Sequence, residues 1–164
     1  MTISTNLQTV AQEIAATAQA AGRAPHAVQL LAVSKTFDAD AVIEAADAGQ
    51  SAFGENYVQE AIDKISEIRQ QRPDLKLEWH FIGPLQSNKT RSVAENFDWV
   101  HAVDREKIAQ RLSDQRPSTL PPLNICLQVN VSGEATKSGV TPAALPELAR
   151  AVAAMPRLCL RGLM

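Results

Sequence analysis

The hydrophobic positions along the chain form two alternating kinds of segment. Short apolar runs, often β-branched, alternate with longer stretches in which apolar residues recur every three or four positions. The first pattern is typical of buried strands and the second of amphipathic helices, and their alternation indicates a parallel α/β architecture. The pattern predicts six strands, at about residues 28–34, 51–55, 77–82, 97–103, 123–131 and 158–164.

Polar residues at the strand ends are candidates for the starts of helices. Gln59 stands three residues after Asn56, the spacing of a capping box. A helix predicted at about residues 141–155 contains Pro146, so its start is expected later than Thr141. A short polar helix is predicted from Ser87, and helix caps are predicted at Asp38, Asn56 and Asp104.

The fifth predicted strand has the most informative alternation. Its odd-numbered positions are apolar, whereas its even positions are Asn124, Cys126, Gln128 and Asn130. In an open sheet with helices on both sides, both faces should be apolar. One polar face favours a barrel that is covered by helices outside and has polar groups at its mouth. The intervening helices argue against an antiparallel sheet.

The number of strands bears on domain organisation. A (β/α)8 barrel takes about 250 residues. The sequence therefore predicts a single α/β domain of TIM-barrel type over residues 1–164, with about six strands present and the C-terminal part incomplete. Because open edges expose unpaired backbone groups, we expect such a chain to be unstable or to associate.

Composition narrows the possible partners. The chain is 45% hydrophobic and 21% charged, as ordinary globular domains are. Its net charge is −2, and it has no basic run interleaved with aromatic residues, which argues against nucleic-acid and membrane partners. It shows neither a signal-peptide pattern nor a membrane-length apolar stretch, so a cytoplasmic location is expected. Cys126 and Cys159 lack motif spacing and are expected to be buried and reduced.

Lys35 is the leading candidate for chemistry. In parallel α/β folds, sites form at the carboxyl ends of strands, and Lys35 directly follows the first strand, on the same face as Leu31 and Val33. A lysine held there is expected to be partly desolvated. Desolvation disfavours an ammonium ion and exposes the lone pair that imine formation with an aldehyde requires. From position alone, a lysine turned into solvent is the commoner outcome.

Other polar residues at strand ends are weaker candidates. Asn56 could donate to a cofactor oxygen or cap a helix, and its spacing favours capping. His80 shares a strand face with Ile82, so it either lines the barrel or is a satisfied core histidine. Asn130 lies at the carboxyl end of the fifth predicted strand and could belong to the mouth of the barrel, where a solvated turn is the alternative. His101 has no identifiable partner and is expected to be structural. No dinucleotide, phosphate-loop, zinc or nucleophile-elbow motif is found, so neither metal nor serine chemistry is expected.

Several of these residues fall within five longer motifs: Leu31–Thr36 (LAVSKT), Phe53–Glu60 (FGENYVQE), Trp79–Lys89 (WHFIGPLQSNK), Gln128–Val131 (QVNV) and Arg161–Met164 (RGLM). In order and spacing they closely resemble the pyridoxal phosphate homeostasis protein family, over nearly the whole chain. The resemblance implies a barrel similar to the N-terminal domain of alanine racemase, located in the cytoplasm. It also implies pyridoxal 5'-phosphate held as a Schiff base on Lys35.

Members of this family are thought to bind and supply the cofactor, without an established catalytic reaction. The resemblance places Asn56 near the cofactor and His80, Asn88, Asn130 and Met164 around the mouth. The implied partners are the cofactor and apo-enzymes that receive it, and a full-length member is expected to be a monomer. In many relatives proline stands in place of Asp38, and the chain continues into phosphate-binding segments beyond Met164. We therefore expect weak cofactor binding by this chain, or none.

The main alternative is a fold-type III amino-acid racemase or decarboxylase that uses the same lysine. A racemase needs a second acid–base group on the opposite face of the substrate carbanion. In alanine racemases this group is a tyrosine from a second domain across the dimer interface. The chain's one tyrosine, Tyr57, follows Asn56 at a helix start, so the sequence favours cofactor binding without catalysis.

Overall fold

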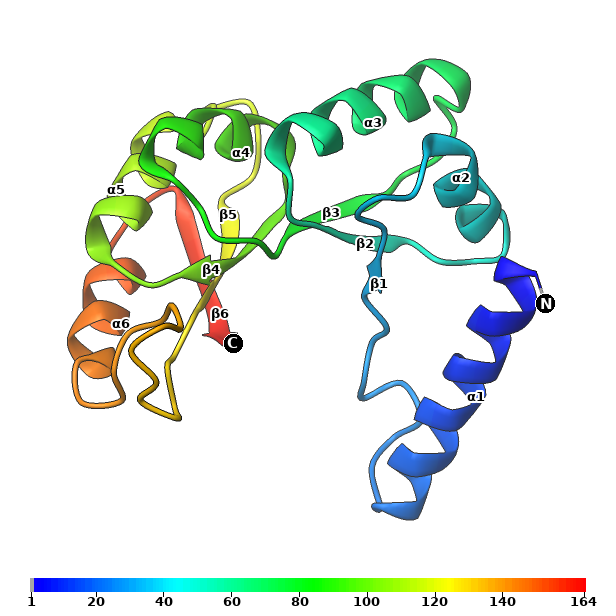
Figure 1. Cartoon of the computed structure of the whole chain (residues 1–164), viewed down its shortest axis with the longest axis horizontal. Coiled ribbons are helices and arrows are strands. Elements are labelled where there is room, and N and C mark those ends of the chain that lie inside the picture. The colour runs from blue at the N-terminus through cyan, green and yellow to red at the C-terminus, as the bar shows by residue number, and fades with distance from the viewer. Residues whose placement is uncertain (1) are drawn as a thin grey trace.

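A computed structural model describes residues 2–164, in which six parallel strands form one curved sheet (Figure 1). The strands lie side by side in their order along the chain. This order lacks the reversal of a doubly wound sheet and is that of a barrel wall, which confirms the predicted TIM-barrel type. The strands are β1 (Ala32–Val33), β2 (Ala52–Glu55), β3 (Glu78–Phe81), β4 (Trp99–Val103), β5 (Leu123–Leu127) and β6 (Leu158–Leu163).

Helices cover the convex side of the sheet (Figure 1). Helix α1 packs beside α2 at the β1 edge, and α6 lies at the β6 edge. None of the helices in the described chain is long and apolar enough to cross a membrane. The helices are α1 (Ile3–Ala20), α2 (Ala39–Asp47), α3 (Val58–Gln71), the 3₁₀ turn η1 (Ser87–Lys89), α4 (Thr90–Asn96), α5 (Glu106–Gln115) and α6 (Leu145–Ala153).

The core fills the space between the sheet and these helices. The predicted alternation of strand five is confirmed within β5, where Leu123, Ile125 and Leu127 are buried and the polar residues between them are half-buried. Phe81 of β3 and Phe97 pack edge to face in the same layer, with ring centroids 5.4 Å apart. Burial of apolar residues on one face of each strand thus keeps that face on the convex side of the sheet, against the helices.

All six strands are shorter than predicted, β1 and β5 the most. β1 has two residues, which pair with Phe53 and Gly54, and Val28 is exposed. As an edge strand, β1 has a partner on one side only, so little ladder bonding extends it. The prediction that strand five reaches Val131 is also wrong. The ladder gives way to an isolated bridge at Val129, and Val131 is 81% exposed.

The predicted helix starts are partly confirmed. Asp38 caps α2 by accepting a hydrogen bond from the Ala41 N–H at 2.9 Å. A 3₁₀ turn begins at Ser87, and α6 begins at Leu145. The caps predicted at Asn56 and Asp104 are wrong, because α3 and α5 begin after Tyr57 and Arg105, and neither has a side-chain cap.

The cysteines are free, as expected, but their predicted full burial is wrong. Cys126 and Cys159 are half-buried. Each lies in the half-buried register of its strand, next to a buried residue of the core, Ile125 or Leu158. Partial burial raises the pKa of the Cys126 thiol.

Arg116 offers a test of the packing between the sheet and its helices. Its buried guanidinium donates to the carbonyl oxygens of Ala94 and Phe97, both at 2.7 Å, and of Pro121 at 2.9 Å. Arg116→Met leaves these acceptors without their donors, so we expect a loss of roughly 2–4 kcal/mol in the free energy of unfolding in urea. Arg91→Met, at an exposed site on α4, should change it by less than about 0.5 kcal/mol. Equal effects of the two substitutions would contradict this account.

Candidate functional site

Lys35 lies in a tight turn directly after β1. The Phe37 N–H donates to the Ser34 carbonyl at 3.1 Å and closes the turn, with Lys35 and Thr36 as its central residues. Lys35 is exposed, so the expected partial desolvation is wrong for this structure. The reason is its place at an edge strand, where no further strand covers the turn. The amine is open to a ligand that approaches the carboxyl end of the sheet.

A buried ion pair lies beneath this turn. Lys64 of α3 and Glu55 of β2 are 2.7 Å apart, and their side chains are 5% and 0% exposed. Lys64 also donates to the Ser34 carbonyl at 2.8 Å. Sequence reasoning missed this pair. Its signal is Lys64 itself, a charged residue on the same helix face as the buried Ala61, Ile65 and Ile68.

Asn56 is placed at the end of β2, beside the end of β3. Its Oδ1 is buried and has no hydrogen-bond partner within residues 2–164. Asn56 lines a cavity of about 620 Å³ together with Gln86 and Lys89. A buried amide oxygen without a partner is costly in a protein interior. The unsatisfied amide oxygen therefore fits a group that presents a hydrogen-bond donor at this edge of the sheet.

His80 lies within β3, on the half-polar concave side, and both of its ring nitrogens have partners. Nδ1 lies 2.9 Å from Nε2 of His101, and Nε2 lies 2.9 Å from Oε1 of Glu78. The ring also stacks on Trp99, with centroids 5.2 Å apart. The expectation that His101 has no partner is wrong, because β3 and β4 are neighbours. In this arrangement His80 is a satisfied barrel-lining histidine.

The ends of β5 and β6 hold Asn130 and Met164. The Asn130 amide donates to the carbonyls of Glu134 and Lys137 at 2.9 and 3.2 Å, and so organises the turn that follows β5. Met164 continues the ladder by donating its N–H to the Leu127 carbonyl, and its side chain is exposed. Asn130 also lines a cavity of about 450 Å³ with Ile82 of the β3 end. Lys35, Asn56, Asn130 and Met164 thus all lie at carboxyl ends of strands, whereas His80 lies inside its strand.

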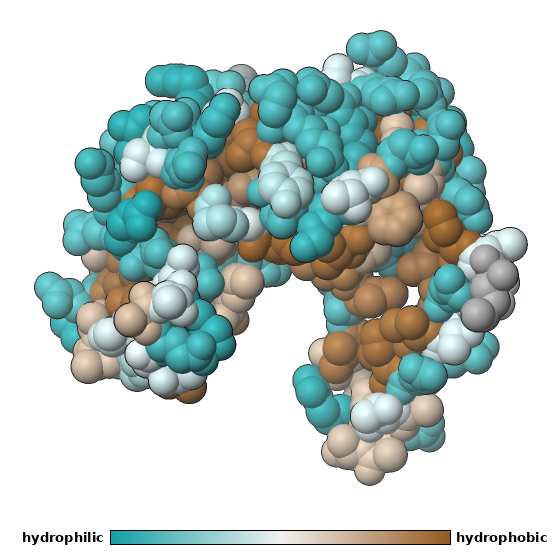
Figure 2. Space-filling model, viewed as in Figure 1, coloured by the Kyte–Doolittle hydropathy of each residue, from teal (hydrophilic) through white to brown (hydrophobic). Residues whose placement is uncertain are grey.

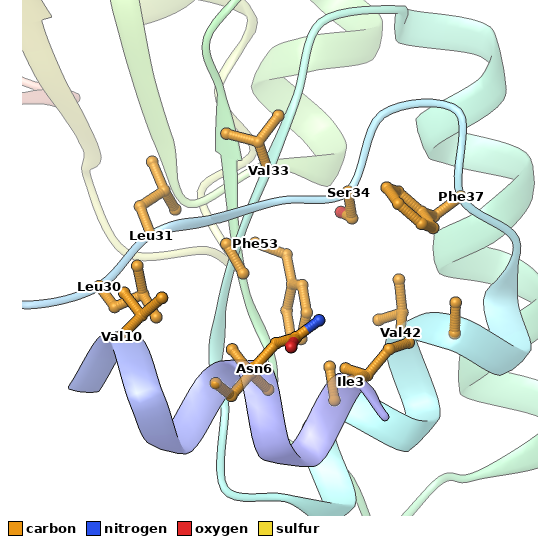
Figure 3. A pocket seen from close by; sticks show the side chains of 14 residues that line it. Ile3, Asn6, Val10, Leu30, Leu31, Val33, Ser34, Phe37, Val42 and Phe53 are labelled. Carbon is orange, nitrogen blue, oxygen red and sulfur yellow. The ribbon is translucent and has the colours of Figure 1, made fainter. Parts of the chain in front are cut away.

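A separate groove of about 370 Å³ runs between α1 and the segment around β1. Figure 3 shows Val10 and Leu30 at one end of it and Ser34 and Phe37 at the other. Figure 2 shows the molecule hollowed on this side of α1, with apolar residues gathered along the hollow. Among residues 2–164, Asn6 and Ser34 are the only polar residues that line the groove, so it does not suit a phosphorylated ligand.

The sequence matches known proteins over almost its full length. The family described as alanine racemase, N-terminal domain, matches residues 5–164. The pyridoxal phosphate homeostasis protein of Pseudomonas aeruginosa is 64% identical over 163 residues, which are 99% of this chain and 69% of that protein. The Escherichia coli K12 protein of the same name is 59% identical over 162 residues, 99% of this chain and 69% of that protein. The chain belongs to the pyridoxal phosphate homeostasis protein family.

Solved structures agree with this family assignment. A Bifidobacterium adolescentis protein has a TM-score of 0.86 at 32% identity, over 99% of this chain and 68% of that one. PipY of Synechococcus elongatus, solved with PLP bound, has a TM-score of 0.76 at 41% identity, over 90% of this chain and 67% of that one. Alanine racemase of Enterococcus faecalis (E. faecalis) shares the fold, with a TM-score of 0.65 at 16% identity, over 95% of this chain and 41% of that one. The homeostasis-protein family thus shares its barrel wall with the racemases.

Gly83 gives a test of the contact between the ends of β2 and β3. A Cβ at Gly83 would lie 2.6 Å from both the Cβ and the carbonyl oxygen of Asn56. We expect Gly83→Ala to lower the free energy of unfolding by about 1–3 kcal/mol, because backbone must shift. Gly162→Ala is the control, since a Cβ there meets nothing within 4 Å. Equal urea midpoints for the two variants would show that this contact is not tight.

The histidine pair predicts how stability depends on pH. Burial lowers the pKa of both His80 and His101 below the usual value of 6.5, although Glu78 partly offsets this at His80. Below about pH 6.5 the unfolded chain therefore binds protons more readily than the folded pair does. The free energy of unfolding decreases as the pH is lowered through this range. Urea unfolding from about pH 8 to pH 5 measures this slope. The slope should become shallower in a His80→Gln, His101→Gln double variant, and an unchanged slope would contradict the assignment.

Proposed function

We propose that this chain binds pyridoxal 5'-phosphate weakly, through a Schiff base on Lys35, and takes part in intracellular cofactor homeostasis. The observation that carries the proposal is an exposed amine at the carboxyl end of β1, in the motif of a family named for this cofactor. The PLP-bound structure of the relative PipY supports it. Residues 1–164 would then act as one cofactor-binding barrel domain.

The residues at the strand ends suit pyridoxal 5'-phosphate in two respects. The Lys35 amine is accessible to an aldehyde, which supplies the electrophilic carbon when the cofactor is bound. Asn56 brings a buried amide oxygen without a hydrogen-bond partner to the neighbouring strand end. Asn130 and Met164 complete the proposed rim of the site. His80 would act from below this rim, because its ring nitrogens are already paired with His101 and Glu78.

The proposal favours cofactor binding over racemisation. A racemase needs a second acid–base group opposite the lysine. Tyr57 is exposed beside Asn56 at the start of α3, and no contact in the described chain ties its hydroxyl to Lys35. We further propose apo-enzymes as recipients of the cofactor. The cytoplasmic location and the association of this chain through its edge strands stay predictions.

Titration with pyridoxal 5'-phosphate, followed by borohydride reduction and peptide mapping, tests the proposal. Reduction fixes the cofactor on the lysine that holds it, so the labelled peptide should contain Lys35. Lys35→Arg should abolish this label, because a guanidinium stays protonated and does not form the imine. Lys76→Arg, at an exposed lysine remote in sequence from β1, should leave it unchanged. Labelling at another lysine in the unaltered chain would refute the proposal.

A further inference from the structure

The turn that carries Lys35 is strained. Thr36 has a φ of +68°, and it is the only non-glycine residue with a positive φ in residues 2–164. Glycine is the usual residue at such a turn position, and a β-branched residue there is an outlier. A conformation of this kind persists only where the surroundings fix it, and such positions cluster at functional sites.

The two residues that flank Lys35 are tied to the ion pair beneath the turn. The Thr36 N–H donates to Oε1 of Glu60 at 2.8 Å, and this contact, helped by Lys64, holds the pKa of the Glu60 carboxyl below its usual range. On the other side, the Ser34 hydroxyl donates to Oε1 of Glu55 at 2.7 Å. The side chain of Lys35 has no part in these contacts and is free to react.

Lys64 joins the two sides of the turn. Its ammonium donates to the Ser34 carbonyl at 2.8 Å, to Glu55 at 2.7 Å and to Glu60 at 3.3 Å. Glu55 belongs to β2, and Glu60 belongs to the first turn of α3. One cation therefore fixes a strand, a helix and the turn against one another.

Packing alone does not account for this network. An apolar residue at position 64 would bury the same helix face without removing a charge from water, which is costly even for a paired ion. In addition, Oε2 of the fully buried Glu55 has no partner in the described chain. The strained backbone of Thr36 thus lies next to the exposed Lys35, and the buried ion pair with the unsatisfied oxygen of Glu55 lies beneath the same turn.

We infer that Glu55, Glu60 and Lys64 are positioning residues, which hold the turn so that the Lys35 amine meets an aldehyde at the mouth of the barrel. This inference rests on the proposed function of Lys35. In the bond-forming step, the neutral Nζ of Lys35 bonds to the aldehyde carbon and its two protons pass to the aldehyde oxygen. The C–O bonds break, a C=N bond forms, and the oxygen leaves as water. A fixed turn raises the rate at Lys35 relative to the chain's other lysines.

Glu60→Ala is the most direct variant, because Glu60 is 38% exposed and its loss should leave the fold intact. Without its acceptor, Thr36 can relax to a negative φ and carry Lys35 out of place. With pyridoxal 5'-phosphate and borohydride, we expect labelling at Lys35 to slow on the order of tenfold, with label shifted to other lysines. Glu60→Gln keeps an acceptor for the Thr36 N–H and should restore most of the rate.

A second substitution distinguishes a role of Glu60 in positioning the turn from a role in stabilising α3. Glycine adopts a positive φ without strain, so Thr36→Gly should restore labelling at Lys35 in the Glu60→Ala background. A purely structural role of Glu60 in α3 predicts no such rescue. Asp63→Ala is the matched control, because it removes an exposed carboxylate of the same helix that bonds only to Gln59. Its labelling rate and its urea midpoint should equal those of the unaltered chain.

The outcomes separate the two claims. If the unaltered chain is labelled at Lys35 and Glu60→Ala is labelled equally fast, the positioning role is overturned and the proposed function stands. If the unaltered chain is labelled at another lysine, the proposed function fails and the positioning role fails with it. A Glu60→Ala variant that loses labelling but is not rescued by Thr36→Gly also overturns the inference.

Discussion

The contact between the Lys64 ammonium and its three oxygen acceptors is the interaction on which the rest of the site depends. It is buried, it is charged, and it joins α3 to β2 and to the turn that follows β1. Because β1 is an edge strand of two residues, its own ladder bonds contribute little to holding that turn. The position of Lys35 is thus set by side chains of the next βα unit rather than by its own strand.

The rest of the sheet determines which side chains surround this turn. Apolar burial on the convex side fixes which way each strand faces, and polar residues are left on the concave side. There Glu78, His80 and His101 form a chain of contacts across β3 and β4. The candidate site forms at the strand ends above this layer. The architecture therefore places the Glu78–His80–His101 chain below a rim where the Oδ1 of Asn56 has no partner in the described chain and Lys35 is exposed.

The sequence predicts the fold well, because hydrophobic periodicity directly encodes burial. All six strands lie where it places them, and the half-polar register of β5 indicates the barrel. An edge effect explains the error in the length of β1, since periodicity does not reveal that this strand has one neighbour. The caps predicted at Asn56 and Asp104 fail because a polar residue before a helix has other possible uses, and only packing decides among them.

The site is less predictable. Lys35 is found from its motif, but its exposure follows from its place after an edge strand. The positive φ of Thr36 depends on a contact with Glu60, more than twenty positions away. The partner of His101 becomes evident only once β3 and β4 are paired. The Glu55–Lys64 pair has a sequence signal, a lysine on an apolar helix face, yet its partner could not be named without the register of β2.

A crystal structure of the chain soaked with pyridoxal 5'-phosphate tests the central claim most directly. The account predicts continuous density between the cofactor and Nζ of Lys35, with Thr36 still at a positive φ and its N–H still bonded to Glu60. Cofactor density on another lysine, or a turn that reaches the cofactor only after Thr36 has left Glu60, would contradict it.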